Sequence, residues 1–269
     1  MYRYAKKTRV AVSAALAIVA AVSVASSVIG IGLTFGWIKR IQIVPLLLSA
    51  GLPWIIGWML ITFVFGRIYC SSVCPLGTLQ DCISRVSRSA LKNRGYFYSR
   101  PLWSVRWLFF FAMICAIGWA SMTLTLALDP YSGFHRIVDG VVLPVFSLGA
   151  LSVNLAMAVG ALATLIVVMF FSAYKGRLLC NTICPVGTGL GLLSISPVFR
   201  MDINTDKCIG CNRCVEVCKA SCIDPSAHTV DTTRCVVCFN CTAVCSNNAI
   251  TYTCNRHRLK TPMLMENQR

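Results

Sequence analysis

The chain has 269 residues, of which 57% are hydrophobic and only 13% are charged, and its net charge at pH 7 is +16. Soluble domains carry about twice this share of charged residues, so the composition excludes a disordered or nucleic-acid-binding chain. In so apolar a chain, a basic excess is typical of a membrane protein that is oriented by its cytoplasmic Lys and Arg residues. The 16 cysteines are either a disulfide framework or metal ligands, and their spacing distinguishes the two.

Four stretches without charged residues are long enough to cross a bilayer, which takes about 20 apolar residues. They predict transmembrane helices at Val10–Ile38, Ile41–Gly66, Trp107–Leu128 and Ala150–Tyr174. Pro144 and Gly149 interrupt the uncharged run before the fourth helix. We therefore expect an interfacial or re-entrant piece at Val141–Leu148.

The basic residues predict how these helices are oriented. All but three of the 25 Lys and Arg residues lie before the first span, between the second and third, or after the fourth. This bias places both termini in the cytoplasm and predicts a multi-pass protein of a bacterial inner membrane. One alternative is that the first span is a cleaved signal peptide, with Ser23-Val24-Ala25 as the cleavage site.

An internal repeat follows the second and fourth predicted spans. The motif G-R-x2-C-x3-C-P-x-G-T occurs at Gly66–Thr78 and again at Gly176–Thr188. It predicts two related helix pairs, each ending in a cysteine pair that shares a helical face until a proline ends or kinks the helix. Four thiols meet in this arrangement at the cytoplasmic rim: Cys70, Cys74, Cys180 and Cys184. We expect a redox or metal site, the alternative being packing alone, and the pattern does not distinguish a cluster, a single metal ion and a thiol pair.

The composition becomes polar and Cys-rich after Pro197, which predicts a membrane domain at residues 1–197 and a soluble domain at 198–254. The spacing C-x2-C-x2-C-x3-C occurs there twice, at Cys208–Cys218 and at Cys235–Cys245. Such spacing places three thiolates on one tight loop around an iron–sulfur cubane. A disulfide scaffold is disfavoured in the cytoplasm, and zinc sites seldom use this spacing twice. Residues 255–269 form a basic tail.

Residues 202–254 resemble the bacterial ferredoxins that hold two [4Fe–4S] clusters in a small α+β fold. The resemblance implies that one cluster is bound by Cys208, Cys211, Cys214 and Cys245, and the other by Cys218, Cys235, Cys238 and Cys241. The chain departs from the ferredoxin pattern because Lys219 and Ser246, instead of proline, follow the fourth cysteine of each run. Cys222 is also additional, and is either a buried free thiol or a ligand in place of Cys218.

The complete arrangement resembles the membrane-bound quinol dehydrogenase component of periplasmic nitrate reductase systems, and also the membrane ferredoxins of nitrous-oxide reduction and methylamine utilisation. This resemblance implies electron transfer between the quinone pool and an iron–sulfur or flavin partner subunit. A related group with the same motifs serves copper-oxidase assembly. The alternative function is therefore a maturation factor that supplies electrons to a metal centre or to thiols of another protein.

Oxidation of a quinol releases protons, so a quinone site needs polar groups near the membrane edge. Asp129, Tyr131 and His135 form such a group on the outer side, but a full membrane thickness of about 30 Å separates that side from cytoplasmic clusters. No predicted span contains a histidine, so haem cannot bridge this distance. We therefore expect the quinone at the inner rim, with Arg67 and Arg177 as its anchors.

Overall fold

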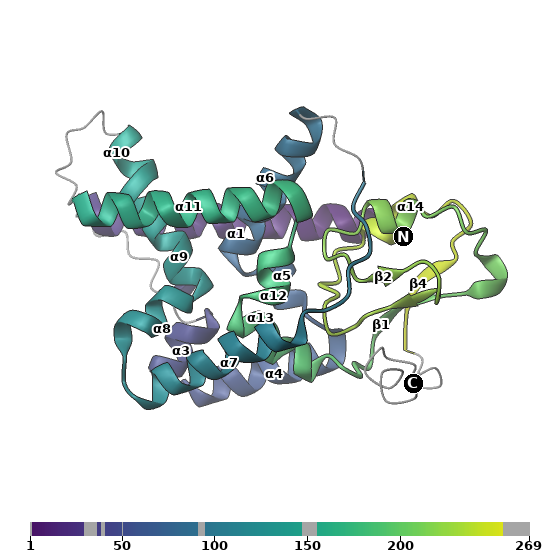
Figure 1. The fold of residues 1–269 in the computed structure, drawn as a ribbon, viewed down its shortest axis with the longest axis horizontal. Coiled ribbons are helices and arrows are strands. Elements are labelled where there is room, and N and C mark those ends of the chain that lie inside the picture. Colours follow the sequence, from purple (N-terminus) through teal and green to yellow (C-terminus); the bar gives the residue numbers. More distant parts are fainter. Residues whose placement is uncertain are drawn as a thin grey trace.

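A computed structural model describes residues 2–29, 37–38, 41–49, 51–90, 95–146 and 155–254. The described helices form an elongated body, and a small ferredoxin-like domain lies at one end of it (Figure 1). The predicted tail at 255–269 lies outside the described residues.

The body contains long apolar helices and several short ones. Its helices are α1 (Tyr2–Ile29), α3 (Ile43–Leu48), α4 (Leu52–Phe65), α5 (Ile68–Ser72), α6 (Pro75–Ala90), α7 (Trp103–Gly118), α8 (Met122–Leu128), α9 (Pro130–Ile137), the π-helical turn η1 (Val138–Val142), α10 (Leu143–Phe146), α11 (Leu155–Lys175), α12 (Leu178–Thr182) and α13 (Pro185–Leu193).

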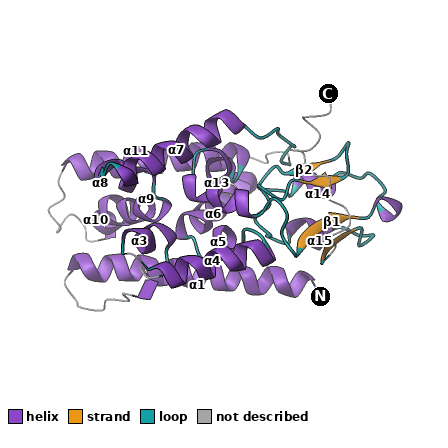
Figure 2. Ribbon diagram, turned by 90° about the horizontal axis from the view of Figure 1, so that it is seen from below, coloured by secondary structure: helices purple, strands orange, loops and turns teal. Residues whose placement is uncertain are grey.

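The helices α1, α4, α7 and α11 run along the long axis of the molecule and occupy the four corners of the body. In Figure 1, α1 and α11 form the upper layer and α4 and α7 the lower one. Seen from below, α1 and α4 lie on one side and α7 and α11 on the other (Figure 2). The short helices α5, α12 and α13 lie between these corners, whereas the 16-residue α6 extends past the upper layer (Figure 1). The four cysteines of the two motifs are buried.

Two described helices are long and apolar enough to cross a membrane, over Tyr4–Ser27 and Leu155–Lys175. The other two corner helices are apolar but shorter, with 14 residues in α4 and 16 in α7. They are short because the structure divides each of the two middle predicted spans into two helices.

The prediction of one continuous helix over Ile41–Gly66 is wrong: α3 ends at Leu48 and α4 begins at Leu52, with Pro53 in its first turn. The predicted helix over Trp107–Leu128 is also interrupted, after Gly118, where Ala120 adopts a left-handed φ of 52°. A left-handed residue cannot continue a right-handed helix.

The piece predicted at Val141–Leu148 is helical as far as it is described, because α9, η1 and α10 follow one another from Pro130 to Phe146. The last predicted span is helical from Leu155 to Lys175. Residues 147–154, where this span was expected to begin, lie outside the described residues.

The repeat in the sequence corresponds to a repeat in the structure. The helices α5 and α12 begin at matching motif positions, as do α6 and α13. A glycine with a positive φ lies just before α5 and just before α12: Gly66 at 80° and Gly176 at 61°. The spacing of the two cysteines in a motif predicted that they share one helix, but they do not. Pro75 and Pro185 each start a new helix instead of ending the previous one. Proline suits a first helical position, where its missing N–H leaves no bond unmade.

The ferredoxin-like domain contains two antiparallel strand pairs and two short helices. Strand β1 (Arg200–Ile203) pairs with β4 (Ile250–Thr253), and β2 (Ile223–Asp224) pairs with β3 (Thr229–Val230). The helices α14 (Arg213–Glu216) and α15 (Asn240–Val244) each carry the third cysteine of one run, and the turn η2 (Thr205–Lys207) precedes the first run.

Hydrogen bonds join this domain closely to the helical body. Arg234 Nη1 donates to Ser99 O at 2.6 Å, and the Arg177 amide donates to Lys219 O at 2.9 Å. At the N-terminal end of α1, Tyr2 stacks on Phe239 with ring centroids 6.2 Å apart. The start of α1 and the ferredoxin-like domain are therefore at the same end of the body.

The motif glycine Gly187 gives a first test of this packing. A Cβ atom there would collide with the backbone carbonyl of Cys180 and with the Arg67 guanidinium. We expect Gly187→Ala to lower the free energy of unfolding by about 1–3 kcal/mol. Gly160→Ala is the matched control, because a Cβ atom on that glycine of α11 meets nothing within 4 Å. Its expected effect is a gain of about 0.5–1 kcal/mol. Thermal unfolding in detergent measures both, and equal stability of the two variants would contradict the packing.

Candidate iron–sulfur sites

The two predicted cluster ligand sets line two separate cavities in the ferredoxin-like domain. The cavity farther from the helical body, the outer cage, is lined by Cys208, Cys211, Cys214 and Cys245. Cys211 is exposed, and the neighbouring Ile209 is 68% exposed. This cage therefore opens to solvent.

The second cavity, the inner cage, is lined by Cys218, Cys235, Cys238 and Cys241, together with Cys222. Cys218 and Cys241 are buried, and Cys238 packs against the core of the helical body. The Cys222 sulfur lies 3.5 Å from that of Cys218. The additional cysteine is thus buried beside the inner cage, which is compatible with both of its predicted roles.

The backbone of both cysteine runs has the shape that a cluster needs. Gly210 and Asn212 adopt left-handed φ angles of 68° and 56°, and Val237 and Phe239, at the same places in the second run, adopt 51° and 58°. Such angles are costly for valine and phenylalanine and mark functional constraint. Alternating right- and left-handed residues form concave nests of N–H groups that bind anions, Fe–S clusters among them. The donor sets and the backbone therefore fit two [4Fe–4S] clusters, each of which would carry single electrons when bound.

The four cysteines of the two C-x3-C-P motifs, here called the thiol quartet, are Cys70, Cys74, Cys180 and Cys184, and all four are buried. They come from both repeats and interact electrostatically: Cys184 with the other three, and Cys74 with Cys70 and Cys180. Burial raises the pKa of the Cys180 thiol to about 11, although the nearby Arg177 opposes the shift. Cys180 is therefore a thiol at neutral pH, and binding to a metal would release its proton.

Arg67 and Arg177, the predicted quinone anchors, are both completely buried. Arg67 donates to Cys180 O at 3.4 Å, and Arg177 donates to Cys70 O at 2.6 Å, so each arginine holds the first motif cysteine of the other repeat. Their bonds to the chain leave little room for a quinone. The burial therefore argues against direct quinone contacts and favours a structural role.

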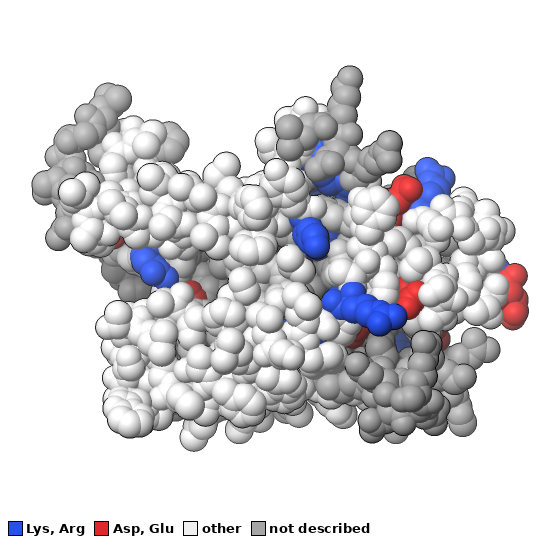
Figure 3. Space-filling model, in the orientation of Figure 1, with Lys and Arg blue, Asp and Glu red and all other residues white. Residues whose placement is uncertain are grey.

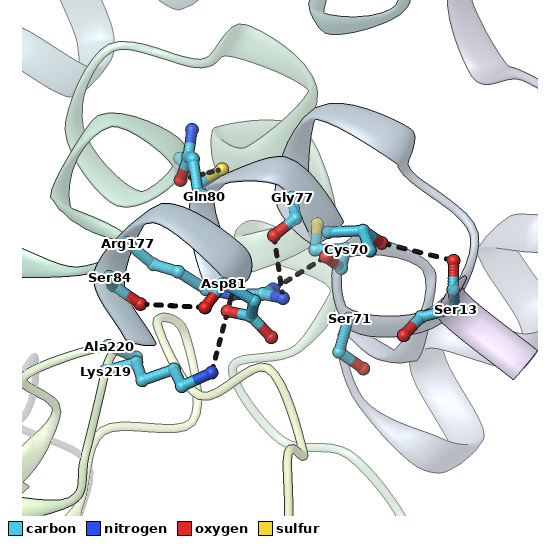
Figure 4. A network of polar contacts seen from close by, with 12 residues as sticks. Ser13, Cys70, Ser71, Gly77, Gln80, Asp81, Ser84, Arg177, Lys219 and Ala220 are labelled. Carbon is cyan, nitrogen blue, oxygen red and sulfur yellow. Dashed lines mark hydrogen bonds and ion pairs between the residues drawn. The ribbon is translucent and has the colours of Figure 1, made fainter. Parts of the chain in front are cut away.

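A buried ion cluster lies where α6 meets the ferredoxin-like domain (Figure 4). Asp81 is 2.8 Å from Arg177, 3.2 Å from Lys219 and 3.6 Å from Arg9. Burial alone would raise the pKa of Asp81, but the three cations outweigh it and hold the pKa well below its usual value. Asp81 is therefore charged at neutral pH, and three buried cations share one carboxylate.

The junction contains more buried positive than negative charge. Besides the cations around Asp81, it buries Arg67, Arg106 and Arg234, whereas the second buried acid is Asp231. Arg106 Nε and Nη2 are buried without a hydrogen-bond acceptor among the described residues. Unpaired buried charge is costly unless an anion compensates it. Clusters held by four thiolates are anionic, so the surplus fits clusters next to this junction.

Asp129, one of the three outer residues weighed as a quinone site, has a structural role. The Asp129 carboxylate caps α9 by accepting hydrogen bonds from the amides of Tyr131 at 3.3 Å and Ser132 at 2.8 Å. Arg136 donates to the carbonyls of Leu126 and Ala127. These contacts are typical of a helix start and of a helix end.

An apolar groove of about 470 Å³ lies between α4 and α7, with α13 as its floor and α3 beside it. Pro185 and Val186, which directly follow Cys184, belong to the floor. Trp58 lines the groove and meets the Tyr69 ring edge-on at 5.1 Å, and the Tyr69 hydroxyl donates to Gln42 at 2.7 Å. The groove thus has an apolar interior with the thiol quartet and a polar pair close behind it.

Sequence reasoning missed Asp81, Lys219 and Gln80 as parts of these sites. The unusual Lys219 was visible as a departure from the proline of the ferredoxin pattern. Its partner Asp81 lies far away in the sequence, so no local signal connects the two. Gln80, the residue before Asp81, accepts a hydrogen bond from the Cys180 thiol at 3.1 Å and is completely buried.

Comparisons with protein families agree with iron–sulfur binding. A family described as a 4Fe-4S binding domain matches residues 47–94 and 157–201, which contain both membrane motifs. A second family with the same description matches residues 201–224, in the first ferredoxin run. The chain thus contains 4Fe-4S ferredoxin-type domains. No solved structure is detectably similar to it.

Curated relatives are distant. The chain is 26% identical over 180 residues to an Escherichia coli K12 protein named "Putative electron transport protein YccM", covering 65% of this chain and 47% of that protein. It is 24% identical over 183 residues to "Uncharacterized protein MJ0749" of Methanocaldococcus jannaschii, covering 68% of this chain and 63% of the relative. The chain thus spans less than two thirds of these relatives.

Removing the Asp81 carboxylate should destabilise the folded protein. We expect Asp81→Asn to lower the free energy of unfolding by about 3–5 kcal/mol, because three buried cations lose their counterion. The contribution of Asp81 is present above the carboxyl pKa of the unfolded chain, about 4, and is lost as the pH falls through the lower folded pKa. The exposed Asp206→Asn is the control, with a change within about 0.5 kcal/mol. Thermal unfolding at neutral pH is the measurement, and equal loss in both variants would refute the shared ion cluster.

The inner cage allows a test of its ligands. We expect Cys241→Ala to remove about four irons, whereas Cys222→Ala should keep the full iron and sulfide content. The reason is that Ala249 occupies the position of Cys222 in the second run, so alanine is compatible with a filled cage. Iron and acid-labile sulfide analysis decides the matter. Loss of a cluster in Cys222→Ala alone would make Cys222 the ligand.

Proposed function

We propose that the protein is a membrane iron–sulfur electron-transfer protein that connects the quinone pool to a soluble or membrane-associated redox partner. The arrangement that supports this function best is a continuous series of sites. The apolar groove adjoins Cys184, the thiol quartet adjoins the inner cage, and the outer cage opens to solvent. Electrons would pass between quinol and partner along this series.

The charge distribution supports a place in the membrane. On the face shown in Figure 3, most acidic and basic side chains lie between the middle of the molecule and its ferredoxin-like end, a small charged group lies nearer the opposite end, and the rest of the helical body is largely uncharged. Two helices of membrane-spanning length and two shorter apolar helices belong to this body. We infer that all four corner helices lie in the bilayer, with the ferredoxin-like domain on the cytoplasmic side.

The groove is the quinone site in this proposal, in place of contacts to Arg67 and Arg177. Its volume lies within the range of about 300–1,000 Å³ that is typical of small-molecule pockets. It faces outward between two apolar helices, where an isoprenoid tail can enter from the lipid. Tyr69 and Gln42 are buried behind Trp58 and do not line the groove, so binding in the groove would rest on apolar contacts.

The outer cage is the contact point for the partner. Ile209 and Cys211 expose this end of the domain, so a redox protein can approach the outer cluster closely. The resemblance to quinol dehydrogenase components favours an iron–sulfur or flavin subunit as this partner. The alternative role in maturation of a metal centre would use the same route toward a different acceptor.

Filling the groove tests the proposal. Ile114 lines the groove on α7, and Ile114→Trp should slow reduction of the clusters by menaquinol or ubiquinol analogues in liposomes about tenfold, through about 1–3 kcal/mol of lost binding. Ile166→Trp, on the exposed face of α11, is the matched control and should leave the rate unchanged.

Absorbance bleaching of the clusters measures these rates, and reduction by dithionite confirms that both variants contain intact clusters. Unchanged quinol-dependent reduction in Ile114→Trp would refute the groove as the quinone site. Failure of every quinol analogue to reduce the wild-type protein would favour the maturation alternative.

A further inference from the structure

A further cavity, separate from the groove and from the two cages, lies where the start of α1 and the second half of α6 meet the ferredoxin-like domain. Its volume is about 290 Å³, and we call it the basic cavity. Its lining contains four cations, namely Lys6 of α1, Arg85 and Arg88 of α6, and Lys219, and none of its described lining residues is acidic. Three separate parts of the chain thus bring positive charge to one hollow.

Three of these cations lack a counterion in the part of the chain that the structure describes. Lys6, Arg85 and Arg88 form no ion pair with a described acid. Lys219 lies 3.2 Å from Asp81, but it shares that carboxylate with two other buried cations (Figure 4). A cleft lined by charges of one sign concentrates ions of the opposite sign. The basic cavity therefore attracts an anion.

The cavity also contains hydrogen-bond donors that no described residue satisfies. Tyr96 lines the cavity and is only 6% exposed, and its hydroxyl has no hydrogen-bond partner among the described residues. The same holds for Lys219 Nζ, which is buried. The Arg88 guanidinium lies over the Tyr96 ring, 4.5 Å from its centroid, so the arginine and the tyrosine form one wall. Unpaired buried donors are costly, and an anion with several oxygens would accept from them.

A phosphate group matches this set of donors. Arginine binds phosphate through two parallel hydrogen bonds, and lysine binds it as a point charge. Arg85 and Arg88 are three residues apart on α6, so they lie on one face of this helix. A carboxylate has only two oxygens and would leave more of these donors without an acceptor. The chemistry of the lining thus favours a phosphate.

The position of the cavity favours a phosphate that belongs to a lipid. Lys6 lies shortly before the uncharged run of α1, which begins at Val10. The helix α6 packs against both α1 and α11, the two described helices of membrane-spanning length. In the proposed membrane placement, the cavity is therefore at the level of the cytoplasmic head groups. Basic pockets between helices on this side bind the head groups of anionic lipids.

We propose that the basic cavity is a phosphate-binding site, and that the head group of an anionic phospholipid from the cytoplasmic leaflet occupies it. Lys6, Arg85, Arg88 and Lys219 neutralise the phosphate, and the Tyr96 hydroxyl donates to one of its oxygens. Because these residues come from α1, α6 and the ferredoxin-like domain, the bound lipid holds this domain against the helical body. The lipid as the source of the phosphate rests on the proposed membrane placement, whereas the phosphate site does not.

The experiment measures the unfolding temperature of the full chain with its clusters, purified in detergent, as phosphatidylglycerol is added. A ligand that binds the folded state raises this temperature until the site is saturated. We expect saturable stabilisation by phosphatidylglycerol. Phosphatidylcholine should give none because its head group has no net charge, and inorganic phosphate at the same concentration should give none because only a lipid is concentrated in the micelle.

Two variants locate the site. Arg85→Gln/Arg88→Gln should weaken phosphatidylglycerol binding about 30-fold. The matched control Arg100→Gln/Lys175→Gln removes two exposed basic residues that do not line the cavity, and should leave binding unchanged. Tyr96→Phe should weaken binding about tenfold without lowering the unfolding temperature of the lipid-free protein, because the hydroxyl has no partner to lose. Cluster absorbance shows whether each variant has folded.

Equal stabilisation of the wild-type protein and of Arg85→Gln/Arg88→Gln would overturn the proposal, as would full binding by Tyr96→Phe or equal stabilisation by phosphatidylcholine. Saturable binding of inorganic phosphate as tight as that of the lipid would overturn the lipid as the occupant. Quinol-dependent reduction is measured separately. Lipid binding without quinol activity would refute the proposed function alone, and quinol activity without lipid binding would refute this site alone.

Discussion

The structure depends on a reciprocal pair of arginine contacts between the two membrane repeats. Arg67 donates to the carbonyl of Cys180, and Arg177 donates to the carbonyl of Cys70. Gly77 and Gly187 leave room for these bonds, because a Cβ atom on either would collide with the cysteine carbonyl of its own motif that accepts the arginine's bond. Within each motif, the arginine thus holds the other repeat, and the glycine leaves space for the arginine that comes from it.

The buried charge connects this core to the ferredoxin-like domain. Arg177 contacts Cys70 through one nitrogen and Asp81 through another, and Lys219, directly after Cys218, contacts the same carboxylate. Several basic residues that the sequence analysis counted as signals of membrane orientation are therefore internal, among them Arg9, Arg106 and Arg177. Composition alone cannot separate such buried basic residues from the exposed ones on which the orientation rule depends.

The sequence predicted those features that depend on residues close together in the chain. The cysteine runs of the ferredoxin-like domain and the two membrane motifs were visible because their spacing is local, and the cages contain the residues expected. Hydropathy wrongly predicted a continuous helix in each of the two middle spans. Averaged hydropathy contains no information on the left-handed Ala120 or on the start of α4 near Pro53. The ion cluster could not be predicted, since Asp81, Arg177 and Lys219 meet only after both domains have folded together.

In both internal repeats of the chain, each half supplies contacts to the other half. In the ferredoxin-like domain, Cys218 and Cys245 each end one run of cysteines and line the cavity of the other run. In the membrane part, each repeat holds the backbone of the other through its arginine, and α6 of the first repeat packs on α11 of the second. One cysteine run alone would therefore lack the fourth cysteine of its own cavity, and one C-x3-C-P repeat alone would lack the arginine that holds the carbonyl of its first cysteine. Both sites thus depend on contacts between halves that lie far apart in the sequence.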